Sequence, residues 1–351
     1  MTSTPYLLPT ALTRHALSDG LPVAGNLWAA SVTLRQRGGK DHALAPAALP
    51  PALAERVELI SAPRPAFAGL SLDRPLVMGI INVTPDSFSD GGDRLQAERA
   101  VAEGLAMAEA GAVILDVGGE STRPGADPVP LEEELRRVLP VISPLAERGL
   151  VVSVDTRRPA VMRAAAEAGA RILNDVTALT GEADSLETAA ELGLPVVLMH
   201  MQGDPRTMQA DPRYHDVALD VFDRLEARVG ACLAAGIPRA RIAVDPGIGF
   251  GKTLEHNLKL LDNLALFHGL GCPLLLGVSR KSFISKLMPG EGPAPKQRFP
   301  GSLAAALAGV QRGVQILRVH DVAETCQALK VWTAIAASSE REFSPKAPSL
   351  L

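Results

Sequence analysis

From about residue 76 onward, the sequence alternates between short apolar segments and longer amphipathic ones. The apolar segments are rich in Val, Ile and Leu without polar alternation, which is typical of strands buried on both faces. They lie at residues 76–83, 113–117, 151–154, 172–176, 195–199, 242–244, 274–278 and 316–319. Amphipathic stretches such as 94–110, 216–235 and 252–268 lie between them. This alternation predicts an α/β protein with a parallel sheet.

Eight strands over roughly 260 residues match the size and order of a (β/α)8 TIM barrel. An open, doubly wound sheet is the alternative, and the right-handed crossover rule holds for both. Polar residues end nearly every strand, which favours the barrel because barrel active sites are built from these ends. We expect the barrel at residues 66–340 and a C-terminal tail at 341–351.

The first 65 residues do not follow this pattern, and proline is frequent from residue 46 to residue 75. We predict short strands at 27–34 and 57–61, with a helical turn at 52–56 between them. No chemistry can be identified in this segment. We therefore expect a small N-terminal extension, and deletion of residues 1–60 should leave activity largely intact.

The composition limits the classes of function. With 35 Lys+Arg and 39 Asp+Glu the formal net charge is −4, so an electrostatic grip on nucleic acid or anionic lipid is not expected. Cys232, Cys272 and Cys326 lie far apart and form no Cys-x-x-Cys pair, which argues against a zinc knuckle or a disulfide framework. There is no secretory signal pattern and no long apolar run. We expect a soluble cytoplasmic protein.

Each predicted strand is followed by at least one hydrogen-bonding or charged side chain. They include Asn82, Asp155, Asn174, His200, Asp245, Ser279, Lys281, Ser282, Arg318 and His320. Taken singly, the Asp and Asn residues are equally well explained as turn caps, and His200 is better explained as a satisfied core histidine than as a ligand. Arg318 and His320 are two residues apart and share a face. Because charge is costly against the helix layer, that face should be the barrel mouth.

Three further features suggest a ligand. The glycine-rich segment 247–253 fails both the Walker A and the dinucleotide pattern. Ser282 opens a helix beside Lys281, and such a helix N-terminus can bind an anion. Two long Gly- and Pro-containing loops follow the first two strands and are typical of active-site lids. Together the polar residues suit a planar heterocycle, a diphosphate with a divalent cation, and a small carboxylate.

In these motifs the sequence resembles the dihydropteroate synthases over about residues 65–337. The motifs are Asn-Val-Thr-Pro-Asp-Ser-Phe-Ser-Asp-Gly-Gly at 82–92, Gly-Glu-Ser-Thr-Arg-Pro-Gly at 119–125, Asp-Pro-Gly-x-Gly-Phe-Gly-Lys at 245–252, Ser-Arg-Lys at 279–281 and Arg-Val-His-Asp at 318–321. Where the family often has Phe in the third motif, this chain has Ile248, a difference that concerns packing more than chemistry. The resemblance implies a TIM barrel that joins p-aminobenzoate to a dihydropterin diphosphate.

The resemblance also implies a role for each matching residue. The pterin ring would be held by Asp155, Asn174, Asp245, Lys281 and Arg318. The diphosphate would be held by Asn82, Arg123 and His320, and Asn82 would also meet Mg2+. The p-aminobenzoate pocket would be formed by Phe88, Thr122, Pro124, Phe250 and Ser282. Asp90 would lie near the amine, so Asp90, Arg123, Lys281 and His320 are the expected catalytic residues. A homodimer through the late barrel helices is implied as well.

Two alternatives share the fold. A methyltransferase barrel that binds a folate would keep the contacts of Asp155, Asn174 and Asp245, but it would not need the diphosphate-binding residues or Lys281 with Ser282. A non-catalytic pterin-binding barrel would be expected to have lost charged residues at the mouth. All of them are present in this sequence, which favours the synthase.

Overall fold

The computed structural model describes residues 5–83, 93–121, 126–204, 206–290 and 292–338. Its largest unit is an eight-stranded parallel sheet in the order β10-β9-β8-β7-β6-β5-β12-β11. The strands are β5 (Leu76–Asn82), β6 (Ile114–Gly118), β7 (Val152–Asp155), β8 (Ile172–Asp175), β9 (Val196–Met199), β10 (Ile242–Asp245), β11 (Leu275–Gly277) and β12 (Ile316–Val319). A backbone bridge between Val244 and Leu274 joins the two ends of the sheet. The predicted (β/α)8 barrel and all of its strands are confirmed.

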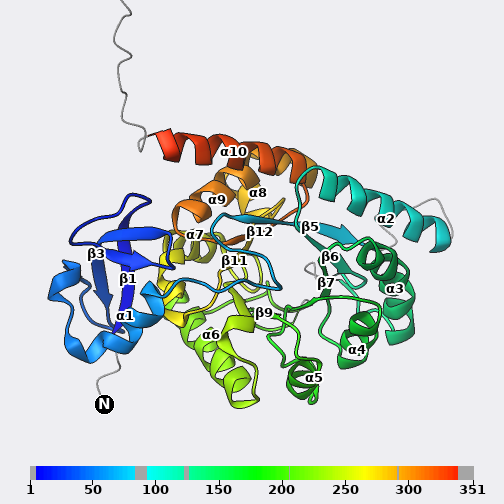
Figure 1. Cartoon of the computed structure of the whole chain (residues 1–351), viewed down its shortest axis with the longest axis horizontal. Helices are drawn as coiled ribbons and strands as arrows, with labels where there is room; N and C mark the ends of the chain where they lie inside the picture. Colours follow the sequence, from blue (N-terminus) through cyan, green and yellow to red (C-terminus); the bar gives the residue numbers. More distant parts are fainter. Residues whose placement is uncertain (1–4, 84–92, 122–125, 205, 291, 339–351) are drawn as a thin grey trace, which may run out of the picture.

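Helices surround the barrel (Figure 1). They are α2 (Asp93–Glu109), α3 (Leu131–Glu147), α4 (Pro159–Glu167), α5 (Ser185–Leu192), α6 (Val217–Ala234), α7 (Leu254–Asp262), α8 (Ser282–Lys286), α9 (Phe299–Gln311) and α10 (Val322–Ser338), with the 3-10 helices η4 (Arg239–Arg241), η5 (Leu264–Leu270) and η6 (Pro295–Arg298). The helix predicted at 252–268 is two elements, α7 and η5. Asn263 separates them, because its side chain donates to Lys259 O at 2.8 Å and so competes with the backbone.

The N-terminal end of the barrel is closed by apolar side chains. Phe67 is fully buried and packs with Met78, Ile114, Ile172 and other residues near the starts of the strands. The segment before β5 folds back through a bridge between Phe67 and Leu70. With this end filled, the opposite end, where the strands finish, is the one that can hold a ligand.

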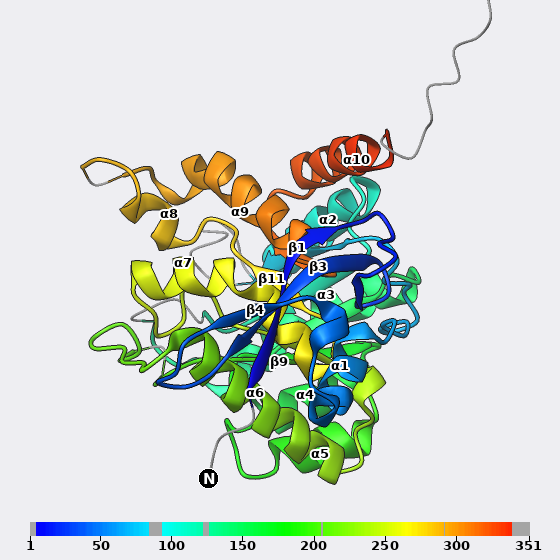
Figure 2. The ribbon, with the colours of Figure 1, turned by 90° about the vertical axis from the view of Figure 1, so that its left-hand side faces the viewer.

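The N-terminal extension is a small antiparallel sheet with one α-helix. Its elements are β1 (Tyr6–Thr13), β2 (Leu21–Val23), β3 (Leu27–Arg35), β4 (His42–Leu44), η1 (Pro46–Ala48), η2 (Pro51–Leu53) and α1 (Ala54–Ser61). β1 and α1 pack against η5. The sheet lies beside the barrel in Figure 1 and in front of it in Figure 2. The extension has its own apolar cluster, which includes Leu7, Val23, Leu27 and Ile60.

Two predictions for the extension are confirmed and one is wrong. The helical turn at 52–56 is η2 and the start of α1. The strand at 27–34 is β3, but the strand predicted at 57–61 lies in α1. Val57 and Ile60 are three residues apart and both join the apolar cluster of the extension, while Glu58 is exposed. This spacing is helical, and a window of five residues is too short to separate it from strand alternation.

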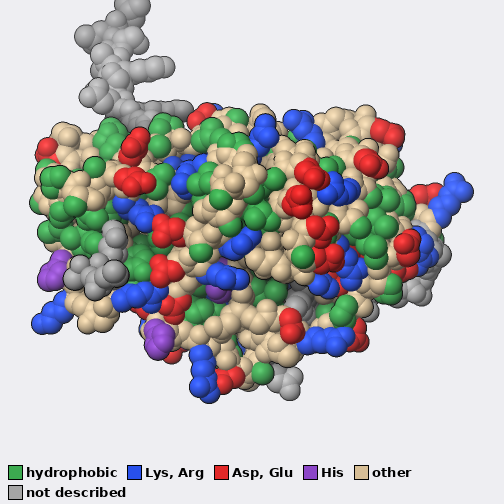
Figure 3. Space-filling model, turned by 90° about the horizontal axis from the view of Figure 1, so that it is seen from below, with side chains coloured by type: hydrophobic (Ala, Val, Ile, Leu, Met, Phe, Trp, Pro, Cys, Tyr) green, Lys and Arg blue, Asp and Glu red, His purple; other side chains and the backbone are tan. Residues whose placement is uncertain are grey.

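The surface carries charges of both signs. On the face shown in Figure 3, acidic and basic side chains are interspersed. In the ranges that the structure describes, no helix has the length and apolar character needed to cross a membrane.

Candidate active site

Three charged side chains meet inside the barrel at the strand ends. Arg318 on β12 donates from Nε to Asp116 Oδ2 at 2.6 Å and from Nη2 to Asp155 Oδ2 at 2.7 Å. Asp116 lies on β6 and is fully buried, and Asp155 is the last residue of β7. Arg318 thus faces the lumen, as predicted, and is fixed by carboxylates from two other strands.

Asp116 is a site residue that the sequence analysis did not identify. Besides Arg318, its Oδ2 accepts a hydrogen bond from Asn174 Nδ2 at 3.0 Å. Asn174 lies on β8 and is 5% exposed. A signal was present, because Asp116 is an acidic residue inside an apolar strand, where a carboxylate is costly without a partner.

A second group of charges lies beside Gly277 on β11. A Cβ added to Gly277 would be 3.8 Å from Asp245 Oδ2 and 3.8 Å from Lys281 Nζ, and 4.0 Å from Arg318 Cβ. Asp245 ends β10 and its Oδ1 accepts from Gly247 N at 2.7 Å, so Oδ2 is the oxygen turned to this space. The missing side chain at Gly277 leaves room that three charged residues border.

The loop after β10, residues 246–253, brings Phe250 to the same place. Lys281 Nζ lies 4.5 Å from the centre of the Phe250 ring, a cation–π contact, and donates to Ile248 O. Gly247 and Gly251 have positive φ values of 68° and 61°. Added Cβ atoms would lie 1.9 Å from His200 O and 2.5 Å from Gln202 O. This glycine-rich loop is thus packed directly on the backbone that follows β9.

The other described candidates lie around the mouth. His320 follows β12, and its Nδ1 and backbone N are 3.0 Å and 3.2 Å from Ser279 Oγ. Asn82 is the last residue of β5 and is half-buried. Ser282 is exposed and begins α8, with Lys281 at the N-cap position. The predicted helix start at Ser282 is confirmed.

Burial shifts the protonation of this cluster. Desolvation lowers the pKa of Lys281 to about 8, although Asp245 favours the charged form. Desolvation raises the pKa of Asp245 above its usual range, against the attraction of Lys281. It also raises the pKa of Asp155, against the attraction of Arg318. Desolvation would lower the pKa of Arg318, but Asp116 and Asp155 together raise it, so the guanidinium stays charged.

His200 is a satisfied core histidine, as predicted. It is 7% exposed, and its Nδ1 accepts from the buried Lys252 Nζ at 3.0 Å. His200 also borders a cavity of about 560 Å3 beside the loops that follow β6, β7, β8 and β9. The residues assigned to the pterin ring are not among those that line this cavity, which adjoins their cluster and does not contain it.

Some predicted residues lie outside the described ranges. They are Phe88 and Asp90 in the first long loop, and Thr122, Arg123 and Pro124 in the second. The described structure brings together Asp155, Asn174, Asp245, Lys281, Arg318 and Phe250. Their roles toward ligands stay predictions.

Comparison with known proteins gives a consistent result. A family model described as "Pterin binding enzyme" matches residues 78–320. The dihydropteroate synthase of Escherichia coli K12 is 50% identical over 274 residues, which cover 78% of this chain and 96% of that protein.

Solved structures agree with this relative. The structure of Xanthomonas albilineans dihydropteroate synthase with 4-aminobenzoic acid has a TM-score of 0.72 and 53% identity, and the match covers 77% of this chain and 97% of that one. The complex of the Xanthomonas albilineans enzyme with 7,8-dihydropteroate has a TM-score of 0.69 and 50% identity, with 76% and 96% covered. Each match spans nearly the whole relative and leaves part of this chain unmatched.

Proposed function

The chain belongs to the pterin-binding enzymes and, among them, to the dihydropteroate synthases, and from this membership we propose how its own residues carry out the reaction. The enzyme transfers a pterinylmethyl group: 6-hydroxymethyl-7,8-dihydropterin diphosphate and p-aminobenzoate give 7,8-dihydropteroate and diphosphate, a step in folate biosynthesis. The observation that carries the residue roles is the convergence of Asp245, Lys281 and Arg318 on the space beside Gly277.

The pterin ring would lie in this space. Its edge presents N–H and amino donors, and Asp245 Oδ2 faces the space as an acceptor. Asp155 and Asn174 would complete the polar edge, while Lys281 donates and the planar guanidinium of Arg318 lies over the ring. Asp116 would act through Arg318 and Asn174, since it holds both of them in place.

We assign the diphosphate to Asn82, Arg123 and His320, and the metal to Mg2+ near Asn82. The described residues include no group of three His, Cys, Asp or Glu side chains that could hold a metal. The Asn82 side chain can supply one oxygen ligand to Mg2+, which usually keeps several waters and also binds substrate phosphates. When bound, the ion would supply positive charge that stabilises the leaving diphosphate.

The p-aminobenzoate would lie between Phe250 and the start of α8. Phe88, Thr122 and Pro124 would shape the other side of this pocket, with Asp90 near the amine. Ser282 and the backbone N–H groups of its turn would donate hydrogen bonds to the carboxylate of the substrate, because helix N-termini favour negative charge.

The chain's residues assist the reaction mainly through charge and position. As the bond from the exocyclic methylene to the diphosphate oxygen breaks, hydrogen bonds from Arg123 and His320 strengthen on the leaving group. The carboxylates of Asp155 and Asp245 favour the positive charge left on the pterin. The amine nitrogen of p-aminobenzoate then forms the new C–N bond and loses a proton. This aromatic amine is neutral near pH 7, so alignment with the methylene matters more than a strong base.

We further propose a homodimer that works in the cytoplasm. Val331 and Ile335 lie one turn apart on α10 and are 56% and 66% exposed. Two large apolar side chains exposed on one face of a late barrel helix support an interface there.

Coupled turnover tests the proposed function. The purified chain is mixed with Mg2+, dihydropterin diphosphate and p-aminobenzoate, and both products are followed by chromatography. We expect diphosphate and dihydropteroate to appear together and a sulfonamide to compete with p-aminobenzoate. Tight binding of the pterin diphosphate without any condensation would support the non-catalytic barrel instead.

A further inference from the structure

An arginine at the end of β3 links the N-terminal extension to two barrel helices. Arg35 donates from Nη2 to Asp216 Oδ2 at 2.7 Å and from Nη1 to Asn263 Oδ1 at 2.9 Å. Asp216 is the N-cap of α6, and Asn263 lies between α7 and η5. The Arg35 side chain is only 15% exposed. Arg35 therefore fixes the start of α6 relative to the end of α7.

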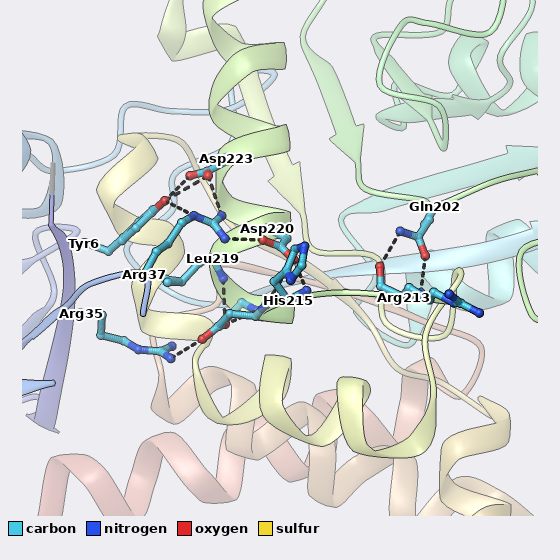
Figure 4. A network of polar contacts seen from close by, with 11 residues as sticks. Tyr6, Arg35, Arg37, Gln202, Arg213, His215, Leu219, Asp220 and Asp223 are labelled. Carbon is cyan, nitrogen blue, oxygen red and sulfur yellow. Dashed lines mark hydrogen bonds and ion pairs between the residues drawn. The ribbon is translucent and has the colours of Figure 1, made fainter. Parts of the chain in front are cut away.

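A second arginine, two residues later, contacts the next turns of α6 (Figure 4). Arg37 donates to Asp220 Oδ1 at 2.5 Å and to Asp223 Oδ2 at 2.7 Å. Tyr6 from β1 donates to Asp223 Oδ1 at 2.8 Å and accepts from Arg37 Nε at 3.1 Å. Asp220 and Asp223 are three residues apart and share a face of α6, and the extension supplies the cations that this acidic face needs.

The same carboxylates organise the chain before α6. Asp220 Oδ2 accepts from the backbone N of His215 at 2.8 Å and of Asp216 at 3.2 Å. Asp216 Oδ1 accepts from the backbone N of Ala218 and Leu219. One oxygen of each carboxylate thus binds the extension. The other oxygen of Asp220 holds the end of the β9–α6 loop, and the other oxygen of Asp216 caps the first turn of α6.

Tyr214, in the loop before α6, contacts the loop that follows β10. Tyr214 donates from its hydroxyl to Gly251 O at 2.8 Å, and its ring packs edge-on against His256 at 5.0 Å. Gly251 follows Phe250, whose ring lies under Lys281 Nζ. Contacts therefore run without a break from β3, through the start of α6 and Tyr214, to the Phe250 side of the active site.

We propose that Arg35 and Arg37 are positioning residues for the p-aminobenzoate pocket. They hold the β9–α6 loop, so that Tyr214 fixes the carbonyl of Gly251 and, with it, the ring of Phe250. This inference rests on the proposed role of Phe250 in binding p-aminobenzoate. It gives the extension a function in the reaction.

The competing explanation is that the extension only stabilises the barrel, and the chain offers a matched control. Arg56 also joins the extension to α6, through Glu226 at 2.5 Å, and it donates to Gly269 O at 2.6 Å. Glu226 lies beyond Asp223 along α6, away from its first turn. A purely structural extension would make Arg56 and Arg37 equivalent in kinetics.

The test compares R35A, R37A, R56A and Y214F in the full chain. We expect R35A and R37A to raise KM for p-aminobenzoate by about three- to tenfold, with kcat and KM for the pterin diphosphate within about twofold. R56A should lower Tm yet leave both KM values within about twofold. Y214F should raise KM for p-aminobenzoate as much as R37A does. In the R37A/Y214F double variant KM should rise no further than in the more affected single variant, because both substitutions break the same chain of contacts.

Hydrogen exchange measures the same link without turnover. In R35A, R37A and Y214F, peptides covering residues 246–253 should exchange faster than in the wild type, and in R56A they should not. Equal KM changes and equal exchange in R37A and R56A would overturn the proposal. A wild type without turnover would contradict the proposed function alone, since the exchange pattern would still decide the inference. If R35A fails to fold, R37A and Y214F carry the comparison.

Discussion

At the scale of single residues, the charge of Lys281 should set the alkaline limit of activity. Burial lowers the pKa of Lys281 to about 8, so its positive charge is present below that pH and is lost as the pH rises through it. The charged Nζ donates to Ile248 O and lies over Phe250. We expect kcat/KM for the pterin diphosphate to fall about tenfold per pH unit above that value.

The control for this prediction is K281R. Arginine stays charged over the whole range, so the variant should lose the alkaline decline even if its activity is lower throughout. A pH–rate profile measured from pH 6 to 10 in both proteins checks this. The same decline in K281R would assign it to another group.

Asp116 offers a second residue-scale prediction. Replacing it by Asn removes the charge that Arg318 Nε and Asn174 share but keeps the size of the side chain. We expect D116N to bind the pterin diphosphate at least about tenfold more weakly, roughly 1.4 kcal/mol. Calorimetry measures this, with S153A as control, because Ser153 is buried on the neighbouring β7 and its Oγ has no hydrogen-bond partner within the described ranges. Unchanged affinity in D116N would exclude a role for Asp116 at the site.

At the scale of elements, β11 shapes the site by lacking a side chain. A Cβ at Gly277 would be 3.8 Å from Asp245 Oδ2 and from Lys281 Nζ, which is ordinary contact distance, so the fold should tolerate it. The methyl group would nevertheless occupy the space proposed for the pterin. We expect G277A to raise KM for the pterin diphosphate about tenfold or more, with little change in Tm.

A glycine in a helix provides the contrast. A Cβ at Gly230 in α6 would meet nothing within 4 Å, and alanine is the better helix former. G230A should therefore stabilise the chain by about 0.5–1 kcal/mol without changing KM. Denaturant unfolding and steady-state kinetics on both variants check the pair. A G277A enzyme with normal KM would place the pterin elsewhere.

The elements were predictable to different degrees, for a physical reason. Barrel strands are buried on both faces, so their continuous apolar runs mark them directly, and all were placed to within two residues. The segment at 57–61 was misjudged because a window of five residues is too short to separate the helical spacing of Val57 and Ile60 from the alternation of a strand. Asp116 was missed because only polar residues at or after the end of each predicted strand were taken as candidates. Asp116 lies inside β6, and its carboxylate reaches the mouth from there.

At the scale of the whole molecule, the extension is part of the folded unit, which no pattern in its sequence indicates. Its arginines pair with acids on α6 that are about 180 residues away in sequence, and such pairing depends on tertiary structure. η5 is fully buried with the extension in place. That residues 1–60 can be removed with little loss of activity stays a prediction. These contacts argue against it, because removal would expose η5 and leave Asp216 and Asp220 without their cations.

The junction between extension and barrel should also make stability depend on pH. His268 in η5 is fully buried, its Nε2 donates to Arg312 O at 2.9 Å, and its Nδ1 has no hydrogen-bond partner among the residues that the structure describes. Arg64 from the extension donates to His268 O at 2.9 Å. Desolvation, with Arg64 nearby, lowers the pKa of His268 to about 4, from an ordinary value of about 6.5 in the unfolded chain.

Between these two pKa values the unfolded chain binds a proton that the folded chain excludes. The contribution of His268 to the free energy of unfolding is therefore complete above a pH of about 6.5. It declines as the pH falls toward 4, by up to roughly 3 kcal/mol. Gln can still donate to Arg312 O but does not titrate, so H268Q should lose this part of the decline. Urea unfolding of both proteins at intervals from pH 7 to 4.5 measures this part of the decline. Carboxylates and His200 contribute equally to both proteins, so they cancel in the difference between the two free energies of unfolding. If the free energy of unfolding depended on pH in the same way in the wild type and H268Q, His268 would gain its proton without unfolding the junction. The extension would then be held less tightly than its contacts indicate.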